Sequence, residues 1–213
     1  MHIKSILFIL LIINKPPNIP VHPSMLHFED SLSNGIKYYF NQINLNRKIR
    51  PVNRLDKDTS GIVIFAKNDY MQECLVKQMK LGIFKKEYIA LLEGNVDHNS
   101  DTINAPIARK DTSIIEREIS NTGDIAITHY ELLKNYNEYA YVKFILETGR
   151  THQIRLHSKY IGHPILGDTL YGKSSNLINR QALHAYKINF IHPIKYKKIE
   201  IISKPPKDIS KLI

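Results

Sequence analysis

The sequence predicts an α+β fold with a mixed, largely antiparallel central sheet and flanking helices. Strand-like segments outnumber helical ones, and short turns join most neighbours, as is typical of antiparallel sheets. Residues 125–133 and 139–147 roughly alternate between apolar and polar side chains around a turn at residues 135–138, which predicts a hairpin. A chain of 213 residues can form one sizeable core, or at most two small subdomains sharing one, and we expect a single domain over residues 1–213.

The first apolar run, residues 6–13, follows Lys4 and is too short to cross a bilayer. No small-x-small cleavage motif follows it, so its β-branched residues favour a buried strand over a signal peptide. We therefore expect a cytoplasmic protein. The other elements are expected in this order: a proline-rich loop over 16–23, a helix over 31–42, a strand over 62–67, a helix from Asn68 or Asp69 to Gly82, a strand over 84–92, a polar, turn-rich stretch over 95–124, the hairpin, a helix from Thr151 to Tyr160, and strands over 185–190 and 198–202.

The charge balance is strongly positive. Thirty Lys+Arg residues against 20 Asp+Glu give a net charge of +10 and a pI near 9.5. An excess of this size indicates an anionic partner, with RNA the first candidate; a merely basic surface is the alternative. Cys74 is the single cysteine, which excludes an internal disulfide and a cysteine-built zinc site. Its helical spacing from Met71, Leu75 and Met79 indicates a buried packing role.

Residues 54–61, Arg-Leu-Asp-Lys-Asp-Thr-Ser-Gly, are the most informative stretch. They place Asp56 beside Arg54 and ahead of a tight turn, and an apolar strand follows. A carboxylate next to a guanidinium stays ionised at neutral pH, because the positive charge favours the charged form. The pattern therefore predicts that Asp56 is available as a nucleophile.

A second motif, residues 148–157, reads Thr-Gly-Arg-Thr-His-Gln-Ile-Arg-Leu-His. On a helix beginning at Thr151, His152, Arg155 and Lys159 share one face. A basic stripe near a helix N-terminus suits a phosphate or a carboxylate. The alternative is a solvated charged face, and the Gly-Arg-Thr lead-in favours a site.

Residues 85–90 form the third motif. Alternation along a strand places Lys86, Tyr88 and Ala90 on one side, where a tyrosine ring can stack on a base while an ammonium group meets phosphate. The plainer alternative for Tyr88 is an ordinary half-buried strand residue. The fourth motif, residues 162–172, is a glycine-punctuated loop that lacks the Lys-Ser/Thr ending of a P-loop.

Other chemistries find little support. The run Asp56-x-Asp58-x-Ser60-Gly61 resembles the start of a calcium loop, but its twelfth position is Lys67 where a glutamate is required. The sequence contains neither a zinc-binding His/Cys motif nor the Gly-x-Ser-x-Gly of a serine hydrolase. We expect no metal.

The motifs together, in this order, resemble those of the RluA branch of RNA pseudouridine synthases. The resemblance covers nearly the whole chain from about residue 11, without a preceding S4-like RNA-binding module. It rests on residues 14–17 with 21–23, residues 54–61, residues 86–90, residues 149–157, residues 162–172 and residues 183–185. It implies the pseudouridine synthase fold.

The resemblance implies that Asp56 is the nucleophile, that Tyr88 packs against a flipped uracil, and that Arg155 pairs with Asp56. Arg54 would hold its turn or contact RNA. Further RNA contacts are expected from four basic residues: Lys86, Arg150, His152 and Lys159. The reaction breaks the N1–C1′ bond of uridine and joins C1′ to C5, so it requires no cofactor. Asp56 either attacks C1′ or assists formation of a glycal, with Tyr88 a candidate for the proton transfer.

The chain departs from the family pattern at Asn53, where a histidine is usual. We expect activity to survive, because asparagine still donates and accepts hydrogen bonds. The expected partner is ribosomal or transfer RNA; no membrane or obligate protein partner is expected, and the chain is expected to be a monomer. A relative that binds RNA without catalysis is the main alternative. A glycosidase is a third, but it needs a second carboxylate, such as Asp58, and suits a basic surface poorly.

Overall fold

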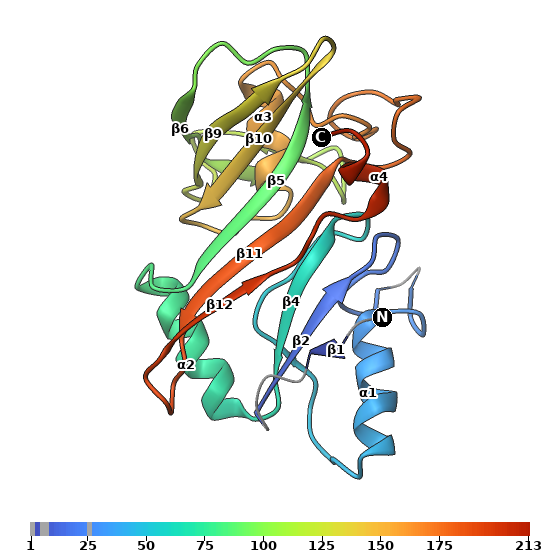
Figure 1. Ribbon diagram of the computed structural model, residues 1–213, viewed down its shortest axis with the longest axis vertical. Helices are drawn as coiled ribbons and strands as arrows, with labels where there is room; N and C mark the ends of the chain where they lie inside the picture. The colour runs from blue at the N-terminus through green and yellow to red at the C-terminus, as the bar shows by residue number, and fades with distance from the viewer. Residues whose placement is uncertain (1–2, 5–8, 25–26) are drawn as a thin grey trace. The chain divides into compact units, whose positions relative to one another are not determined.

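The computed structural model describes residues 3–4, 9–24 and 27–213 (Figure 1). The fold is α+β with largely antiparallel strands, as predicted. The chain forms two compact units. The first unit comprises Met1–Lys85 and Ala185–Lys204, and the second comprises Lys86–His184 and Pro205–Ile213.

The sheet of the first unit has the strand order β1-β2-β4-β11. In it, β2 runs antiparallel to β4, with Lys15 opposite Gly61 and Leu10 opposite Ala66. Two further strands pair with strands of this unit: β12 with β11, and β3 with β4. The strands span Ile3–Lys4 (β1), Leu10–Lys15 (β2), Arg50–Pro51 (β3), Ser60–Ala66 (β4), Leu183–Ile191 (β11) and Lys198–Ile202 (β12).

Burial of β4 explains its unbroken apolar run, since every residue of Ser60–Ala66 is buried. A strand covered on both faces does not show the alternation of a half-exposed one. The core around it draws on β2, β4, β11, β12 and α2, and it includes the stacked rings of Phe84 and Phe190 at 5.7 Å. This core fixes the strands from which the predicted nucleophile loop extends.

Two capped helices accompany this sheet. Helix α1 (Leu32–Gln42) begins at Ser31, whose hydroxyl accepts from the Asn34 N–H in a capping box. Helix α2 (Asp69–Lys80) begins at Asn68, as predicted, and buries Met71 and Leu75. Cys74 is only half-buried at the margin of that face, so its predicted burial is met in part.

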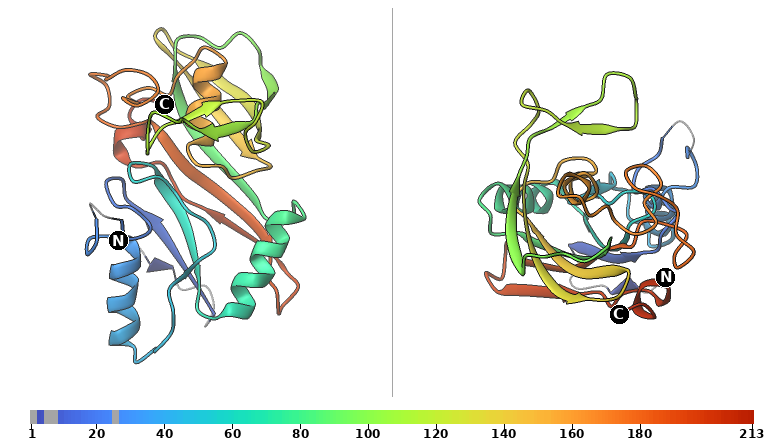
Figure 2. Two further views of the ribbon diagram at one scale, coloured as in Figure 1. Left: turned by 180° about the vertical axis from the view of Figure 1, so that it is seen from behind. Right: turned by 90° about the horizontal axis from the view of Figure 1, so that it is seen from above.

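The second unit contains an antiparallel sheet with the order β5-β10-β9-β6. The predicted hairpin is confirmed as β9 and β10. Helix α3 contacts β9 and the small hairpin β7–β8, which stands apart from the sheet on the helix side (Figure 2). The elements span Lys85–Glu93 (β5), Ser100–Asn104 (β6), Ile107–Arg109 (β7), Arg117–Ile119 (β8), Ile127–Asn135 (β9), Tyr139–Leu146 (β10), Gln153–Tyr160 (α3) and Lys207–Ser210 (α4).

Three sequence-based expectations differ from the structure. The predicted first strand is found over Leu10–Lys15, and residues 6–8 lie outside the described part of the chain. The stretch over 95–124 is not only turns, because it contains β6, β7 and β8. Helix α3 begins at Gln153 and not at Thr151, because His152 before it has a left-handed backbone (φ 58°); His152 makes no side-chain cap.

Candidate active site

Asp56 lies in the loop between β3 and β4 of the first unit, where the sequence predicted a tight turn. The Thr59 N–H donates to the Asp56 carbonyl at 3.2 Å, which closes that turn. Asp56 is half-buried, whereas Thr59 and Ser60 are buried and Arg54 is exposed. The turn thus holds the Asp56 backbone while part of its side chain reaches solvent.

Lys15 holds this loop in place through a hydrogen bond to its backbone. Its side chain is fully buried, and its ammonium group donates to the carbonyls of Pro16, Ile19 and Lys57 at 2.9, 2.8 and 2.7 Å. A buried ammonium is stable only where its donors are satisfied. Because Lys57 directly follows Asp56, Lys15 links the proline-rich loop to the predicted nucleophile. The sequence analysis identified the motif at residues 14–17 but did not predict that Lys15 bonds to Lys57.

Asn53 acts as part of the strand pairing. Its side-chain amide donates to the Ile62 carbonyl at 2.9 Å, and its side-chain oxygen accepts from the Ile64 N–H at 2.9 Å. The side chain therefore satisfies two backbone groups of β4, as a neighbouring strand would. Asn53, which departs from the histidine expected by the resemblance, thus has a structural role in the strand pairing.

Gly61 allows close packing immediately after the loop. It has φ +117°, and a Cβ there would lie 2.3 Å from the Ala185 carbonyl oxygen. Only glycine fits such a contact, since it has no side chain and accepts positive φ. The glycine of the Thr-Ser-Gly motif thus brings β11 against the start of β4.

Arg54 lies near the proline-rich loop. Burial lowers the pKa of His22, and the positive charge of Arg54 lowers it further. Both effects favour neutral imidazole. Two motifs that are far apart in sequence, residues 21–23 and residues 54–61, therefore meet within the first unit.

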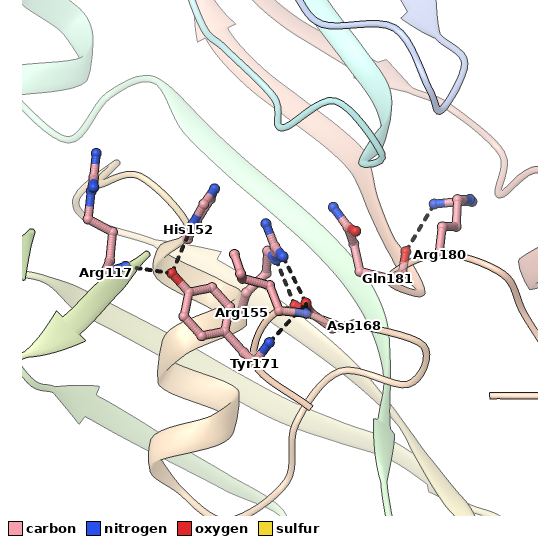
Figure 3. Close-up of polar contacts among 8 residues, drawn as sticks. Arg117, His152, Arg155, Asp168, Tyr171, Arg180 and Gln181 are labelled. Carbon is pink, nitrogen blue, oxygen red and sulfur yellow. Dashed lines mark hydrogen bonds and ion pairs between the residues drawn. The ribbon is translucent and has the colours of Figure 1, made fainter. Parts of the chain in front are cut away.

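Arg155 and Asp168 form a buried ion pair in the second unit (Figure 3). Nε and Nη2 of Arg155 donate to the two carboxylate oxygens at 2.6 and 2.7 Å. The Asp168 carboxylate also accepts from the N–H groups of Leu170 and Tyr171 at 3.1 and 3.3 Å. Bidentate pairing with added hydrogen bonds is the arrangement that stabilises a buried pair.

Asp168 is therefore a partner of Arg155 that the sequence reasoning missed. The only signal was its place in the glycine-punctuated loop, where residue types alone do not name a partner. The pairing predicted between Arg155 and Asp56 concerns residues of different units and stays a prediction.

Tyr171 lies against Arg155 and Lys159 of α3 and against His152, which precedes the helix and is not on its face as predicted (Figure 3). His152 Nδ1 and the Tyr171 hydroxyl are 2.9 Å apart. Arg155 Cζ and Lys159 Nζ lie 5.1 and 5.9 Å from the centre of the Tyr171 ring. Cations at these distances interact favourably with the ring face. His152, Arg155 and Lys159 are thus brought together by one aromatic side chain.

Tyr88 is buried in β5, directly opposite Phe144 of β10. Nearby on the same strand, Lys86 is half-buried, and burial lowers the pKa of its ammonium group. A Cβ on Gly149 would stand 3.0 Å from Lys86 Nζ, so the tip of Lys86 lies against the glycine of the second motif. Lys86 and that motif are therefore neighbours.

Arg150 is exposed, but its guanidinium already has partners. Nη1 pairs with Asp124 at 3.1 Å, and Nε donates to the Ile125 carbonyl at 3.0 Å. The side chain thus anchors the turn that leads into α3, which competes with the RNA contact predicted for it.

In the described ranges, no group of three His, Cys, Asp or Glu side chains is arranged to hold a metal ion. No helix in that part of the chain is both long and apolar enough to span a membrane.

Comparison with known proteins identifies the family. The family described as RNA pseudouridylate synthase matches residues 9–160. The chain belongs to the RNA pseudouridine synthases, which are isomerases. Its relatives include synthases named for the large ribosomal subunit, which supports the resemblance to the RluA branch.

Two relatives and one solved structure illustrate the likeness. The chain is 40% identical to the uncharacterized RNA pseudouridine synthase YjbO of Bacillus subtilis over 203 residues, 95% of this chain and 72% of the relative. It is 36% identical to ribosomal large subunit pseudouridine synthase D of Haemophilus ducreyi over 218 residues, 96% of this chain and 67% of the relative. Human RNA pseudouridylate synthase domain containing 1 has the same fold, with a TM-score of 0.77 at 24% identity over 95% of this chain and 82% of that one.

Proposed function

We propose that this enzyme isomerises uridine to pseudouridine in ribosomal RNA with Asp56 as its nucleophile. The observation that carries the proposal is the loop around Asp56. A buried ammonium from Lys15, a turn closed by Thr59 and a glycine contact at Gly61 all fix its position. A preorganised carboxylate is what attack on a positioned sugar carbon requires.

In the proposed reaction the N1–C1′ bond breaks and a C1′–C5 bond forms within the same nucleotide. The proton at C5 leaves, and N1 of the rotated base ends protonated. Asp56 takes part either by attack at C1′ or by removing a proton at C2′ to give a glycal. The target uridine must leave its stack to reach the site. Tyr88 is proposed to pack against the flipped uracil, and Arg155 to pair with Asp56.

Ribosomal RNA is proposed as the substrate because several relatives are named ribosomal large subunit pseudouridine synthase D. Transfer RNA is the second candidate. Mapping pseudouridine in both RNA classes from cells with and without the gene tests this choice. Loss of a ribosomal site supports the proposal, and loss confined to transfer RNA overturns it.

The nucleophile is tested with RNA labelled with tritium at uridine C5, because formation of the C1′–C5 bond releases that tritium. We expect Asp56→Asn to abolish release while RNA binding persists. Asp58→Asn is the matched control, since Asp58 is a half-buried carboxylate in the same turn. We expect it to retain activity within a few-fold. Activity that survives in Asp56→Asn would contradict the assignment.

The alternative of an RNA-binding relative without catalysis rested on Asn53. That side chain satisfies two backbone groups of β4 and so has a structural reason to be asparagine. Absence of tritium release by the unaltered protein, together with tight RNA binding, would restore this alternative.

A further inference from the structure

The second unit contains an open pocket of about 330 Å³ between the β7–β8 hairpin and α3. Buried Leu156 and Tyr171 line it, together with the half-buried Ile119 and Leu170. None of the proposed catalytic residues is among its lining residues. The pocket therefore requires its own explanation.

The wall formed by Tyr171 is held rigidly in place. Its hydroxyl accepts from the Arg117 N–H at 2.8 Å and bonds to His152 Nδ1 at 2.9 Å (Figure 3). At the other end of the residue, its N–H donates to Asp168. A ring held through its hydroxyl, on a residue whose backbone is also bonded, can receive a flat ligand with little entropy cost of ordering it first.

The pocket also carries charge. Arg117, Lys159 and Lys110 are among its lining residues, with Glu116 and Glu118 as the carboxylates. Glu116 is neutralised by Lys110 at 2.6 Å. The Arg117 side chain donates to a backbone carbonyl, that of Glu116, and so keeps its positive charge uncompensated by that contact. Lys159 is exposed. Apolar and aromatic surface thus adjoins two cations, Arg117 and Lys159, and the carboxylate of Glu118.

We propose that this pocket binds one nucleotide of the RNA strand other than the target uridine. Its base lies on the apolar surface of Ile119, Leu156 and Leu170 beside Tyr171, and its phosphate meets Arg117 and Lys159. Unpaired bases bind to aromatic and apolar side chains while basic side chains follow the backbone. The volume lies at the lower end of the range for small-ligand pockets, about 300–1,000 Å³, which suits a single nucleotide.

This inference rests on the proposed function, because an RNA substrate supplies the nucleotide. It adds a second point of attachment for the strand. Such a contact, made equally in the ground state and the transition state, lowers KM without changing kcat.

Ile119→Phe tests the pocket by filling it without a change of charge. We expect the KM for RNA to rise at least tenfold and kcat to stay within threefold. Leu133→Phe is the matched control, since Leu133 is an exposed strand residue of the same unit that does not line the pocket. We expect it to change neither constant. A KM for Ile119→Phe equal to that of the control would overturn the proposal.

Arg117→Gln is a second variant that preserves the fold around Tyr171, because the backbone N–H of Arg117, not its side chain, bonds the ring. It too should raise KM and spare kcat. Thermal unfolding of each variant separates loss of the pocket from loss of the fold.

Binding of 5′-AMP, followed through the methyl NMR signals of Ile119, Leu156 and Leu170, tests the pocket without catalysis. We expect shifts in the unaltered protein and none in Ile119→Phe. Absence of shifts in the unaltered protein contradicts the proposal, and so do shifts together with an unchanged RNA KM. Failure of tritium release would instead count against the proposed function, since the AMP measurement does not depend on it.

Discussion

At the scale of single residues, buried polar contacts determine the geometry of the candidate site. Lys15 and Asn53 each satisfy backbone groups that would otherwise be buried without a partner. Leaving such a group unsatisfied costs about 1–3 kcal/mol, and hydrogen bonds to a charged group contribute about 1.5–3 kcal/mol each. These contacts therefore contribute to the stability of the first unit and to the position of Asp56.

Lys15→Met tests this role, because methionine has a similar length and no donor. We expect the free energy of unfolding to fall by about 2–5 kcal/mol, since three carbonyls lose their donor. We also expect tritium release to slow, since the loop after Asp56 loses its anchor. Lys57→Met is the control, as its side chain is exposed and its carbonyl is unchanged. Urea unfolding that is equal for the two variants would contradict the prediction.

Residue types that chemistry requires could be predicted, but their partners could not. Local spacing singled out Asp56 as a candidate and placed Arg155 and Lys159 on one helix, which α3 contains. The ion pair between Arg155 and Asp168, 13 residues apart, depends on how the glycine-punctuated loop folds back on α3. The same holds for the contact between Lys15 and Lys57, 42 residues apart. Local patterns carry no information on such pairings.

At the scale of elements, caps and periodicity predicted the longer helices and strands well. Asn68 begins α2, and the alternation over residues 125–147 gives β9 and β10. The strands β6, β7 and β8 were missed, because they are short and mostly polar. Their strand geometry comes from pairing: β6 with β9, and β7 with β8. Edge and hairpin strands of this kind have little propensity signal of their own.

His157 connects α3 to its surroundings and should make stability depend on pH. It is fully buried; Nε2 donates to the Ala105 carbonyl at 2.9 Å, and Nδ1 lies 2.9 Å from the Thr128 hydroxyl. Burial lowers its pKa below the ordinary value of 6.5. The unfolded chain therefore binds a proton that the folded chain does not as pH falls below 6.5. Its contribution to stability is complete above that pH and is lost below it.

His157→Gln keeps a donor for the Ala105 carbonyl and removes the titration. We expect the loss of stability between pH 8 and about pH 5.5, measured by urea unfolding, to be smaller than in the unaltered protein. His22, whose pKa is also lowered, adds to the same slope and keeps the variant from becoming fully flat. A pH dependence identical in both proteins would contradict the prediction.

At the scale of the whole molecule, the net charge of +10 follows directly from the sequence. It bears on affinity for an anionic partner such as RNA and not on the fold. Some of the basic side chains already form ion pairs within the units: Arg150 pairs with Asp124, Arg155 with Asp168, and Arg180 with Asp208. Basic residues therefore divide into those that hold the structure and those that can meet phosphate. Composition cannot separate the two groups, whereas the ion pairs do.

The salt dependence of RNA binding measures the second group. Four phosphate contacts are proposed, from Arg54, Lys86, Arg117 and Lys159, and Arg150 would add a fifth if it left Asp124. Each contact to single-stranded RNA contributes about 0.7 to the slope of log affinity against log salt, so raising salt from about 50 to 200 mM should weaken binding about 50- to 130-fold. The measurement uses Asp56→Asn, which is expected to bind RNA without turnover, and urea unfolding at both salt concentrations serves as the control. Affinity that changes less than threefold would show that the basic surface does not bind the RNA backbone.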